Sequence, residues 1–358
     1  MRIPFQRSRS GIALIIVLVV VVALGILAGG FAYSMKVEMT LARHASFSSE
    51  LDWMGRSGVE VAKWVLAMSS QGPNAQFDSL NQKWAGGSGD TNEILASIDL
   101  KNYPIGNGTV SIDIKDLDRK FNINRADEMI LHQALTLIGA DAGLMTTITG
   151  SILDWRDPDN NPHMGGTESE VYEQQDPPYF AKNGWFDDVS ELLLIRGVTP
   201  AMYWGSSGGG GLPPVFNRPQ GARRSTFDEP TYAVGLVDLF TALSGPQGVN
   251  INTASATVLQ LIPVIDENIA QAIIQRRAGP DGQDGTEDDT PFRSPQEISF
   301  LPGIPPGALQ QFTTLFSVKS LIYEVHVKAS IGSSSREYVA ILRKMNPKDI
   351  QTLNLYWK

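Results

Sequence analysis

An uninterrupted apolar run lies near the start of the chain. Between Ile12 and Tyr33 the Tyr33 hydroxyl is the only polar side-chain group. A helix over residues 12–33 would be about 33 Å long, enough to cross a hydrocarbon core of about 30 Å. The pattern therefore predicts one membrane-spanning helix.

Apolar positions continue beyond this run without a helix break. They recur from Val37 to Leu66, and the first following proline is Pro73. This spacing predicts a single helix over residues 12–70, about 88 Å long, that is lipid-facing in its first half and amphipathic in its second.

Strict alternation of apolar and polar residues marks the strands. Val110, Ile112 and Ile114 alternate with polar residues in the segment TVSIDIK. Such alternation is typical of half-buried strands. The same pattern returns only near the C-terminus, at residues 321–329, 336–343 and 350–357. We expect an antiparallel sheet formed by residues 71–116 and 318–358, split by a long helical segment.

The segment between the strands contains an internal repeat. FNINRADEMIL at residues 121–131 aligns with VNINTASATVL at 249–259, and ELLLIRGVTP at 191–200 aligns with EISFLPGIPP at 297–306. Each repeat predicts an Asn-capped helix, a second helix ending near Trp155 or Arg277, an acidic loop and a helical hairpin with Gly at its turn. The predicted parts are a first unit at 117–205, a Gly- and Pro-rich linker at 206–244 and a second unit at 245–317.

Composition excludes several kinds of chemistry. The chain has no Cys, so it has no disulfides, Cys-ligated zinc, iron–sulfur cluster or thiol nucleophile. The one G-x-S-x-G match, residues 205–209, lies in the glycine linker without the strand that a nucleophile elbow requires. The four His residues show no metal-binding spacing, and there is no Walker A sequence. We expect no enzymatic activity.

The N-terminus carries a recognisable processing signal. A basic leader with Arg2, Arg7 and Arg9 is followed by Gly11 and then IALII. This order resembles the class III leader of type IV pilins and type II secretion pseudopilins. The resemblance implies that prepilin peptidase cuts the Gly11–Ile12 bond and that Ile12 becomes the methylated mature N-terminus.

The leader also sets the orientation in the membrane. Its Arg residues place the N-terminus in the cytoplasm by the positive-inside rule. The expected location is therefore the bacterial inner membrane, anchored by residues 12–33, with the bulk of the chain in the periplasm. The alternative is a secretory signal peptide cut near Ala28–Gly30, which the length of the apolar run disfavours.

One departure from the general pilin pattern points to a class within that family. Most pilin-like proteins have Glu at mature position five, where this chain has Ile16. A missing Glu suits a subunit with no predecessor, at the tip of the filament, because no ammonium needs neutralising there. With DWRDPDNNP and VNINTAS, this feature resembles the K class of minor pseudopilin of type II secretion.

The K-class resemblance implies a fold, a function and partners. The fold is α+β: a pilin-like long N-terminal helix packed on an antiparallel sheet, with a large all-α insertion of two repeated SAM-like or helix-hairpin-helix-like units. The implied function is protein export across the outer membrane by assembly of the pseudopilus tip. The implied partners are the I-class and J-class minor pseudopilins, prepilin peptidase and the inner-membrane secretion platform. A minor pilin of a related type IV pilus is an alternative.

A membrane-tethered nucleic-acid receptor is the alternative from another class, because the repeat resembles helix-hairpin-helix modules. Those modules bind phosphate through hairpin amides and nearby cations. Here the expected Gly-Ile-Gly hairpin is Val264-Ile265-Asp266, followed by Glu267, and the net charge of the chain is −9. Two carboxylates would face the phosphate, so we expect no nucleic-acid partner.

Both acidic loops are candidate calcium sites. They are crowded with oxygen donors and lie outside the cytoplasm in the predicted topology, which suits a Ca²⁺ site of modest affinity. Neither fits the EF-hand spacing, and a solvated acidic loop remains the alternative. Family resemblance favours Asp157, Asp159 and Glu168. The full candidate set is Asp154, Asp157, Asp159, Asn161, Glu168 and Glu170 in the first loop, and Asp281, Asp284, Asp288 and Asp289 in the second.

The second half of the long helix also contains aromatic residues and glycines. We expect Trp53, Trp64 and the downstream Trp84 to pack in the core under the sheet. Gly55 and Gly58 permit either close approach of a neighbouring subunit's helix or a thin patch under the sheet of the same chain.

Overall fold

The computed structural model describes residues 10–71, 75–88, 95, 97–205, 232–245, 248–305 and 307–358. The Arg residues of the predicted leader, at positions 2, 7 and 9, lie outside this part of the chain. So do residues 206–231 of the predicted linker and most of the G-x-S-x-G match.

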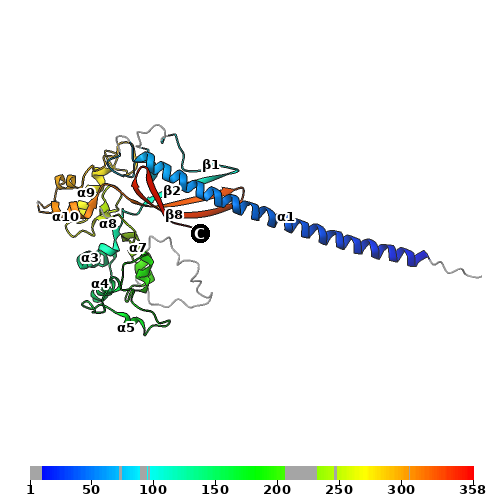
Figure 1. Ribbon diagram of the computed structural model, residues 1–358, viewed down its shortest axis with the longest axis horizontal. Coiled ribbons are helices and arrows are strands. Elements are labelled where there is room, and N and C mark those ends of the chain that lie inside the picture. The colour runs from blue at the N-terminus through cyan, green and yellow to red at the C-terminus, as the bar shows by residue number, and fades with distance from the viewer. Residues whose placement is uncertain are drawn as a thin grey trace, which may run out of the picture.

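A single helix, α1 (Ser10–Ser69), forms the stem of the molecule, as the apolar pattern predicts (Figure 1). Residues 12–42 are exposed along their whole length. The apolar half contains an 18-residue window of mean hydropathy 3.3, none of which is buried against the rest of the chain. From Leu51 onward one face of α1 is buried, including Met54, Ala62 and Leu66.

The buried face of α1 packs on a five-stranded antiparallel sheet with strand order β1-β2-β7-β8-β9. The four predicted strands are present. The structure adds a short edge strand that no alternation marks, because it has only three residues, one of them Pro104. The strands are β1 (Tyr103–Ile105), β2 (Gly108–Asp116), β7 (Ile322–Ile331), β8 (Ser334–Asn346) and β9 (Asp349–Trp357).

Two glycines allow α1 to lie close to this sheet. A Cβ at Gly55 would come 2.3 Å from the Tyr338 ring, and a Cβ at Gly58 would come 2.4 Å from Val327 Cγ1. The contact is therefore within the chain, and the thin-patch interpretation of these glycines holds. The prediction that the tryptophans pack in the core was wrong for Trp53 and Trp64, which are 70% and 39% exposed, and is confirmed for Trp84, which is buried.

The helical insertion consists of short elements that connect β2 to β7. A 3-10 turn, η1 (Lys83–Ala85), precedes the sheet. The first unit contains β3 (Phe121–Asn122), η2 (Ile123–Arg125), α3 (Glu128–Ile138), α4 (Ala142–Arg156), α5 (Ser169–Tyr172), η3 (Val189–Leu194), α6 (Pro200–Trp204), α7 (Leu236–Leu239) and β4 (Phe240–Thr241). The second contains β5 (Val249–Asn250), α8 (Ala256–Leu259), α9 (Glu267–Arg277), η5 (Pro295–Phe300), α10 (Leu309–Leu315) and β6 (Phe316–Ser317).

The two units repeat the same hydrogen bonds at equivalent positions. The Asn124 amide donates to the Phe186 carbonyl and accepts from its N–H, at 3.0 and 2.7 Å. Asn252 does the same with Phe292, at 2.9 and 2.8 Å. The repeated NIN sequence therefore has a structural reason: its second Asn ties the start of each unit to the residue that follows the acidic loop.

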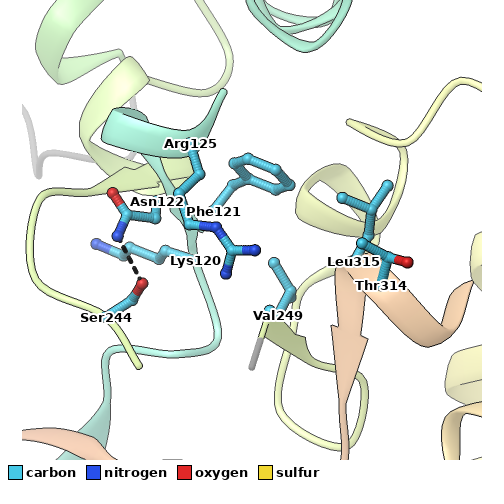
Figure 2. Close-up of a pocket in the computed structure, with 9 residues that line it drawn as sticks. Lys120, Phe121, Asn122, Arg125, Ser244, Val249, Thr314 and Leu315 are labelled. Carbon is cyan, nitrogen blue, oxygen red and sulfur yellow. Dashed lines mark hydrogen bonds between the residues drawn. The ribbon is translucent and has the colours of Figure 1, made fainter. Parts of the chain in front are cut away.

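Each unit closes through a short pair of parallel strands, β3 with β4 and β5 with β6. Residues 236–241, which fall in the predicted linker 206–244, thus belong to the first unit in the structure. The sequence pattern missed them because a two-residue strand leaves no alternation to detect. A shallow pocket lies where the two units meet, lined by Phe121 and Arg125 on one side and Val249 and Leu315 on the other (Figure 2).

Candidate metal centre

The first acidic loop folds back onto the end of α4. Asp154, in the last turn of α4, is fully buried. A Cβ at Gly166 would come 1.9 Å from Asp154 Oδ2, and a Cβ at Gly150 would come 2.7 Å from the Gly166 nitrogen. Only glycine fits at these two positions, and the result is a loop whose backbone covers a buried carboxylate.

Two groups of potential metal ligands share one carboxylate in this loop. Ligand atoms of Asp157, Asp159 and Glu168 lie within 4.8 Å of one another, and so do those of Asp154, Asp157 and His163. The sequence predicted four of these five residues as ligands. The structure brings together side chains that are up to 14 positions apart in the chain.

Several oxygens of the centre are buried without any hydrogen-bond partner in the structure. They are Asp154 Oδ2, Asp157 Oδ1, both carboxylate oxygens of Glu168 and Asn183 Oδ1. A buried polar atom without a partner is costly, and native proteins satisfy nearly all of them. An acceptor-only set of this kind fits a hard divalent cation, because each orphaned oxygen would gain a ligand bond.

The electrostatics of the centre point in the same direction. Burial raises the pKa of Glu168, and the charges of Asp154, Asp157 and Asp159 raise it further. Burial and then the charge of Asp159 raise the pKa of Asp157. Raised carboxyl pKa values mean that the ionised centre is unfavourable by itself, so that a cation among these groups would stabilise it.

His163 supplies the basic side chain nearest to the centre. Its Nδ1 lies 2.6 Å from Asp154 Oδ1 and 3.4 Å from Asp157 Oδ2, and its backbone N–H donates to Asp154 Oδ1 at 2.8 Å. His163 thus satisfies one oxygen of Asp154 and leaves Oδ2 of the same carboxylate unpartnered.

Two predicted ligands lie outside the groups that the structure brings together. Glu170 is exposed in α5, and Asn161 donates its backbone N–H and its amide to Asp159 Oδ1 at 2.8 and 3.0 Å. Sequence reasoning missed Asn183, whose buried Oδ1 has no partner and whose Nδ2 donates to the Asp159 carbonyl at 2.9 Å. Its distance in sequence from the loop left no signal.

The second acidic loop has a different charge balance. Arg277 is buried, and its Nε and Nη2 donate to the two oxygens of Asp284 at 3.0 and 2.7 Å. Asp281 and Asp288 accept backbone N–H groups of the loop. Within the described residues, this loop forms no group of three potential ligands. A guanidinium provides here the positive charge that the first loop lacks.

Comparisons with known proteins agree with this architecture. A family model described as type II secretion system (T2SS), protein K, matches residues 111–204, and one described as a helix-hairpin-helix motif matches residues 245–317. The first match covers the candidate metal centre and the second covers the second helical unit.

The curated relatives carry the same name. The chain is 26% identical over 217 residues to the type II secretion system protein K of Klebsiella pneumoniae, covering 55% of this chain and 61% of that protein. It is 25% identical over 299 residues to the protein K of Pseudomonas aeruginosa, covering 80% and 77%. The Aeromonas hydrophila protein K is 23% identical, with 62% of its length matched. The match thus spans about three fifths of the Klebsiella and Aeromonas relatives.

A solved structure shares the fold. It is the crystal structure of the GspK-GspI-GspJ complex from the enterotoxigenic Escherichia coli type 2 secretion system, with a TM-score of 0.64 at 16% identity. The superposition covers 88% of this chain and 99% of the other. With the stem helix, the antiparallel sheet, the helix-hairpin-helix motif and the named relatives all in agreement, the chain belongs to the type II secretion system protein K family.

Proposed function

We propose that the chain is a structural, non-enzymatic minor pseudopilin that takes part in type II secretion by assembling at the tip of the pseudopilus. The observation that carries this proposal is α1. One helix is exposed and apolar over residues 12–33 and packs under the sheet from Leu51 onward. Such a helix suits a subunit that is stored in a membrane and then packed into a filament.

The place at the tip rests on two features. The helical units lie at the end of the molecule opposite the free half of α1 (Figure 1). A further subunit added at that end of the molecule would have to pack on this wide helical insertion rather than on an uncovered sheet. Ile16 stands where a carboxylate would be needed to neutralise the N-terminus of a preceding subunit.

Partners follow from the family. The neighbouring structure is a complex of GspK with GspI and GspJ. We propose that this chain binds the corresponding I-class and J-class minor pseudopilins. An affinity-tagged chain co-expressed with both should retain them in detergent, and recovery of the chain alone would contradict this assembly.

Processing tests the membrane part of the proposal. We expect mass spectrometry of the mature protein to find Ile12, methylated, at the N-terminus and residues 1–11 removed. A mature N-terminus after Gly29 or Gly30 would show that the apolar run is a cleaved signal peptide. A related type IV pilus would give the same processing, and the identity of the co-purified subunits separates the two systems.

A carboxylate at position 16 should impair assembly. Ile16→Glu would place an unpaired charge in the bilayer at a cost of order 2–3 kcal/mol. We expect less assembled protein and reduced secretion, measured by pulldown of the partner subunits and by assay of a secreted protein. Ile16→Leu is the matched control. Normal secretion by Ile16→Glu, with the chain found along the whole filament, would contradict placement at the tip.

We further propose that the first acidic loop binds Ca²⁺ through Asp157, Asp159 and Glu168, with Asp154 completing the site. The support is the set of buried oxygens without partners and the all-oxygen character of this group. The cation would supply positive charge that holds the loop against α4. Asp154 anchors the site from the helix, and Glu168 closes it from the start of α5.

The helix-hairpin-helix motif favours one other function, binding of nucleic acid at residues 245–317. In the second unit the Asp266 side chain accepts from the Ile269 N–H at 2.8 Å, so a carboxylate already occupies the helix terminus where phosphate would bind. We propose that the motif is a packing scaffold. A gel shift at low salt tests this, and a retarded DNA band would overturn it.

A further inference from the structure

A buried group of ionisable side chains joins the sheet to the second helical unit. Asp116 ends β2, Asp118 follows it, and Asp78 comes from the segment between α1 and η1. Lys344 comes from β8. All four are buried, with exposures between 2% and 6%. Three carboxylates therefore share one ammonium group inside the protein.

The one ammonium group of this cluster, on Lys344, forms a salt bridge with Asp78. Lys344 Nζ lies 2.6 Å from Asp78 Oδ1 and 4.9 Å from the centroid of the Tyr323 ring. The Ser320 N–H donates to Asp78 Oδ2 at 2.9 Å. Asp116 and Asp118 have no salt bridge among the contacts of the described residues.

Asp118 ties the segments of the joint together through backbone groups. Its Oδ1 accepts from the Gly245 N–H at 2.5 Å, and its Oδ2 accepts from the Leu321 and Ile322 N–H groups at 2.6 and 3.0 Å. The Asn250 N–H donates to the Asp118 carbonyl at 2.8 Å. One carboxylate thus joins the start of the second unit to the start of β7.

The groups around the Asp116 carboxyl can form hydrogen bonds with it whether it is ionised or protonated. Its Oδ2 lies 2.6 Å from Ser320 Oγ, 2.6 Å from Thr253 Oγ1 and 3.4 Å from Asn250 Nδ2. When Asp116 is ionised, both hydroxyls donate to it. When Oδ2 carries a proton, it donates to Thr253 Oγ1, whose own hydrogen can turn to the Asn250 carbonyl at 3.3 Å. The heavy atoms need not move for the protonated form to be satisfied.

We propose that this cluster is a proton-dependent joint: Asp116 holds a proton when the second helical unit is fixed to the sheet, and loss of that proton loosens the connection. The ligand is a proton, and the two parts that it joins are the sheet with α1 on one side and the helical insertion on the other. When Asp116 ionises, its carboxyl releases one proton to solvent. Asp116 and Asp118 then carry two negative charges that no cation compensates.

The titration behaviour fits this geometry. Burial, followed by the charge of Asp118, raises the pKa of Asp116 to about 7. Burial also raises the pKa of Asp118, and burial and the three acids raise that of Tyr323, which stays neutral. A carboxyl whose folded pKa is raised contributes stability that is complete at low pH and is lost as the pH rises through about 7.

The other charged groups near the joint line a cleft beside Asp116. The charged side chains that line it are Lys115, Arg119, Lys120, Glu324 and, from α7, Asp238. Lys120 Nζ donates to the Val237 carbonyl at 2.8 Å, and Glu324 pairs with His326. None of these groups makes a hydrogen bond or salt bridge to Asp116 among the described residues, so the joint depends on its own four ionisable groups.

A distance measurement across the joint tests the proposal. The chain has no Cys, so Lys328→Cys in β7 and Gln296→Cys in the second unit provide the only labelling sites in the full-length protein in detergent. We expect the distance distribution between two spin labels to be narrow at about pH 6 and broad at about pH 8. A distribution that is the same at both pH values would overturn the proposal.

Variants assign the effect to Asp116. Asp116→Asn keeps a donor at this position without a titratable charge, so its distribution should stay narrow at both pH values. Asp113→Asn, on the exposed face of the same strand, is the matched control and should respond as the wild type does. A wild-type response in Asp116→Asn would overturn the assignment.

A second variant keeps the test decisive if Asp116→Asn does not fold. Thr253→Val has nearly the same shape but removes a hydroxyl that stabilises the ionised form. The pH at which the distribution broadens should therefore move upward. An unchanged midpoint in Thr253→Val would show that the joint does not titrate through Asp116.

Discussion

Removing calcium should lower the melting temperature of the protein by about 5–10 °C. A cation at 100 times its dissociation constant stabilises the folded state by about 2.7 kcal/mol, and each kcal/mol shifts the melting temperature of a domain of this size by about 2–4 °C. Calorimetry of the full-length protein in detergent, with EDTA and then with millimolar-range Ca²⁺, measures the shift. No heat of binding and no shift would contradict the calcium proposal.

Glu168→Gln should raise the melting temperature relative to the wild type in EDTA and lower it relative to the wild type in calcium. Without calcium, the substitution removes a buried charge that repels Asp154 and Asp157, so the melting temperature should rise. With calcium, the variant loses a ligand, so most of the stabilisation by the ion should disappear. Glu170→Gln, two residues away and exposed, is the matched control and should keep the wild-type response. A lower melting temperature for Glu168→Gln in EDTA would mean that the charge is not what strains the apo loop.

Asp281→Asn extends the same measurement to the second loop. The Asp281 carboxylate accepts from the Gln283 N–H at 2.8 Å, and Asp284 in the same loop is paired with Arg277. If only the first loop binds calcium, the melting-temperature shift in Asp281→Asn should match that of the wild type. A smaller shift would place a second ion at residues 281–289.

Much of the fold followed from the sequence where a pattern repeats over many residues. The stem helix has an unbroken apolar or amphipathic pattern from residue 12 to 66, and four strands have period-two alternation. The repeat could be detected because both units have the same residue types, the NIN sequence and a hairpin glycine, at positions that make the same contacts. The short closing strands β4 and β6 left no such signal, because two residues cannot show a period.

The two acidic loops show where sequence reasoning reaches its limit. Both are rich in carboxylates, and composition treats them alike. The structure separates them because both arginines donate to the repeated Ile carbonyl, Arg277 to Ile251 and Arg156 to Ile123, but among the described residues only Arg277 also pairs with a loop carboxylate, Asp284. Which carboxylate an arginine neutralises depends on where the folded chain places the two side chains, and the sequence pattern alone does not predict this placement.

Gly58→Leu should detach the stem helix from the sheet. A Cβ at this position would already lie 2.4 Å from Val327 Cγ1, in the middle of β7. Overpacking of this kind lowers the free energy of unfolding by about 1–3 kcal/mol. We expect a cost at or above the upper end of this range, because the branched Leu side chain cannot point away from the sheet. The helix propensity of Leu returns less than about 1 kcal/mol, so the clash decides the sign.

The same substitution elsewhere on α1 separates the clash from helix propensity. Gly30 has no atom within 4 Å of an added Cβ, so Gly30→Leu changes the same residue types in open space. In detergent we expect Gly58→Leu to lower the melting temperature by about 6–12 °C for a loss of about 3 kcal/mol, and Gly30→Leu to leave it unchanged or slightly raised. If the two variants melted alike, α1 would not be held at Gly58 by close contact with the sheet. Because the proposed filament subunit needs α1 packed under the sheet, Gly58→Leu should also weaken retention of the partner subunits in the pulldown.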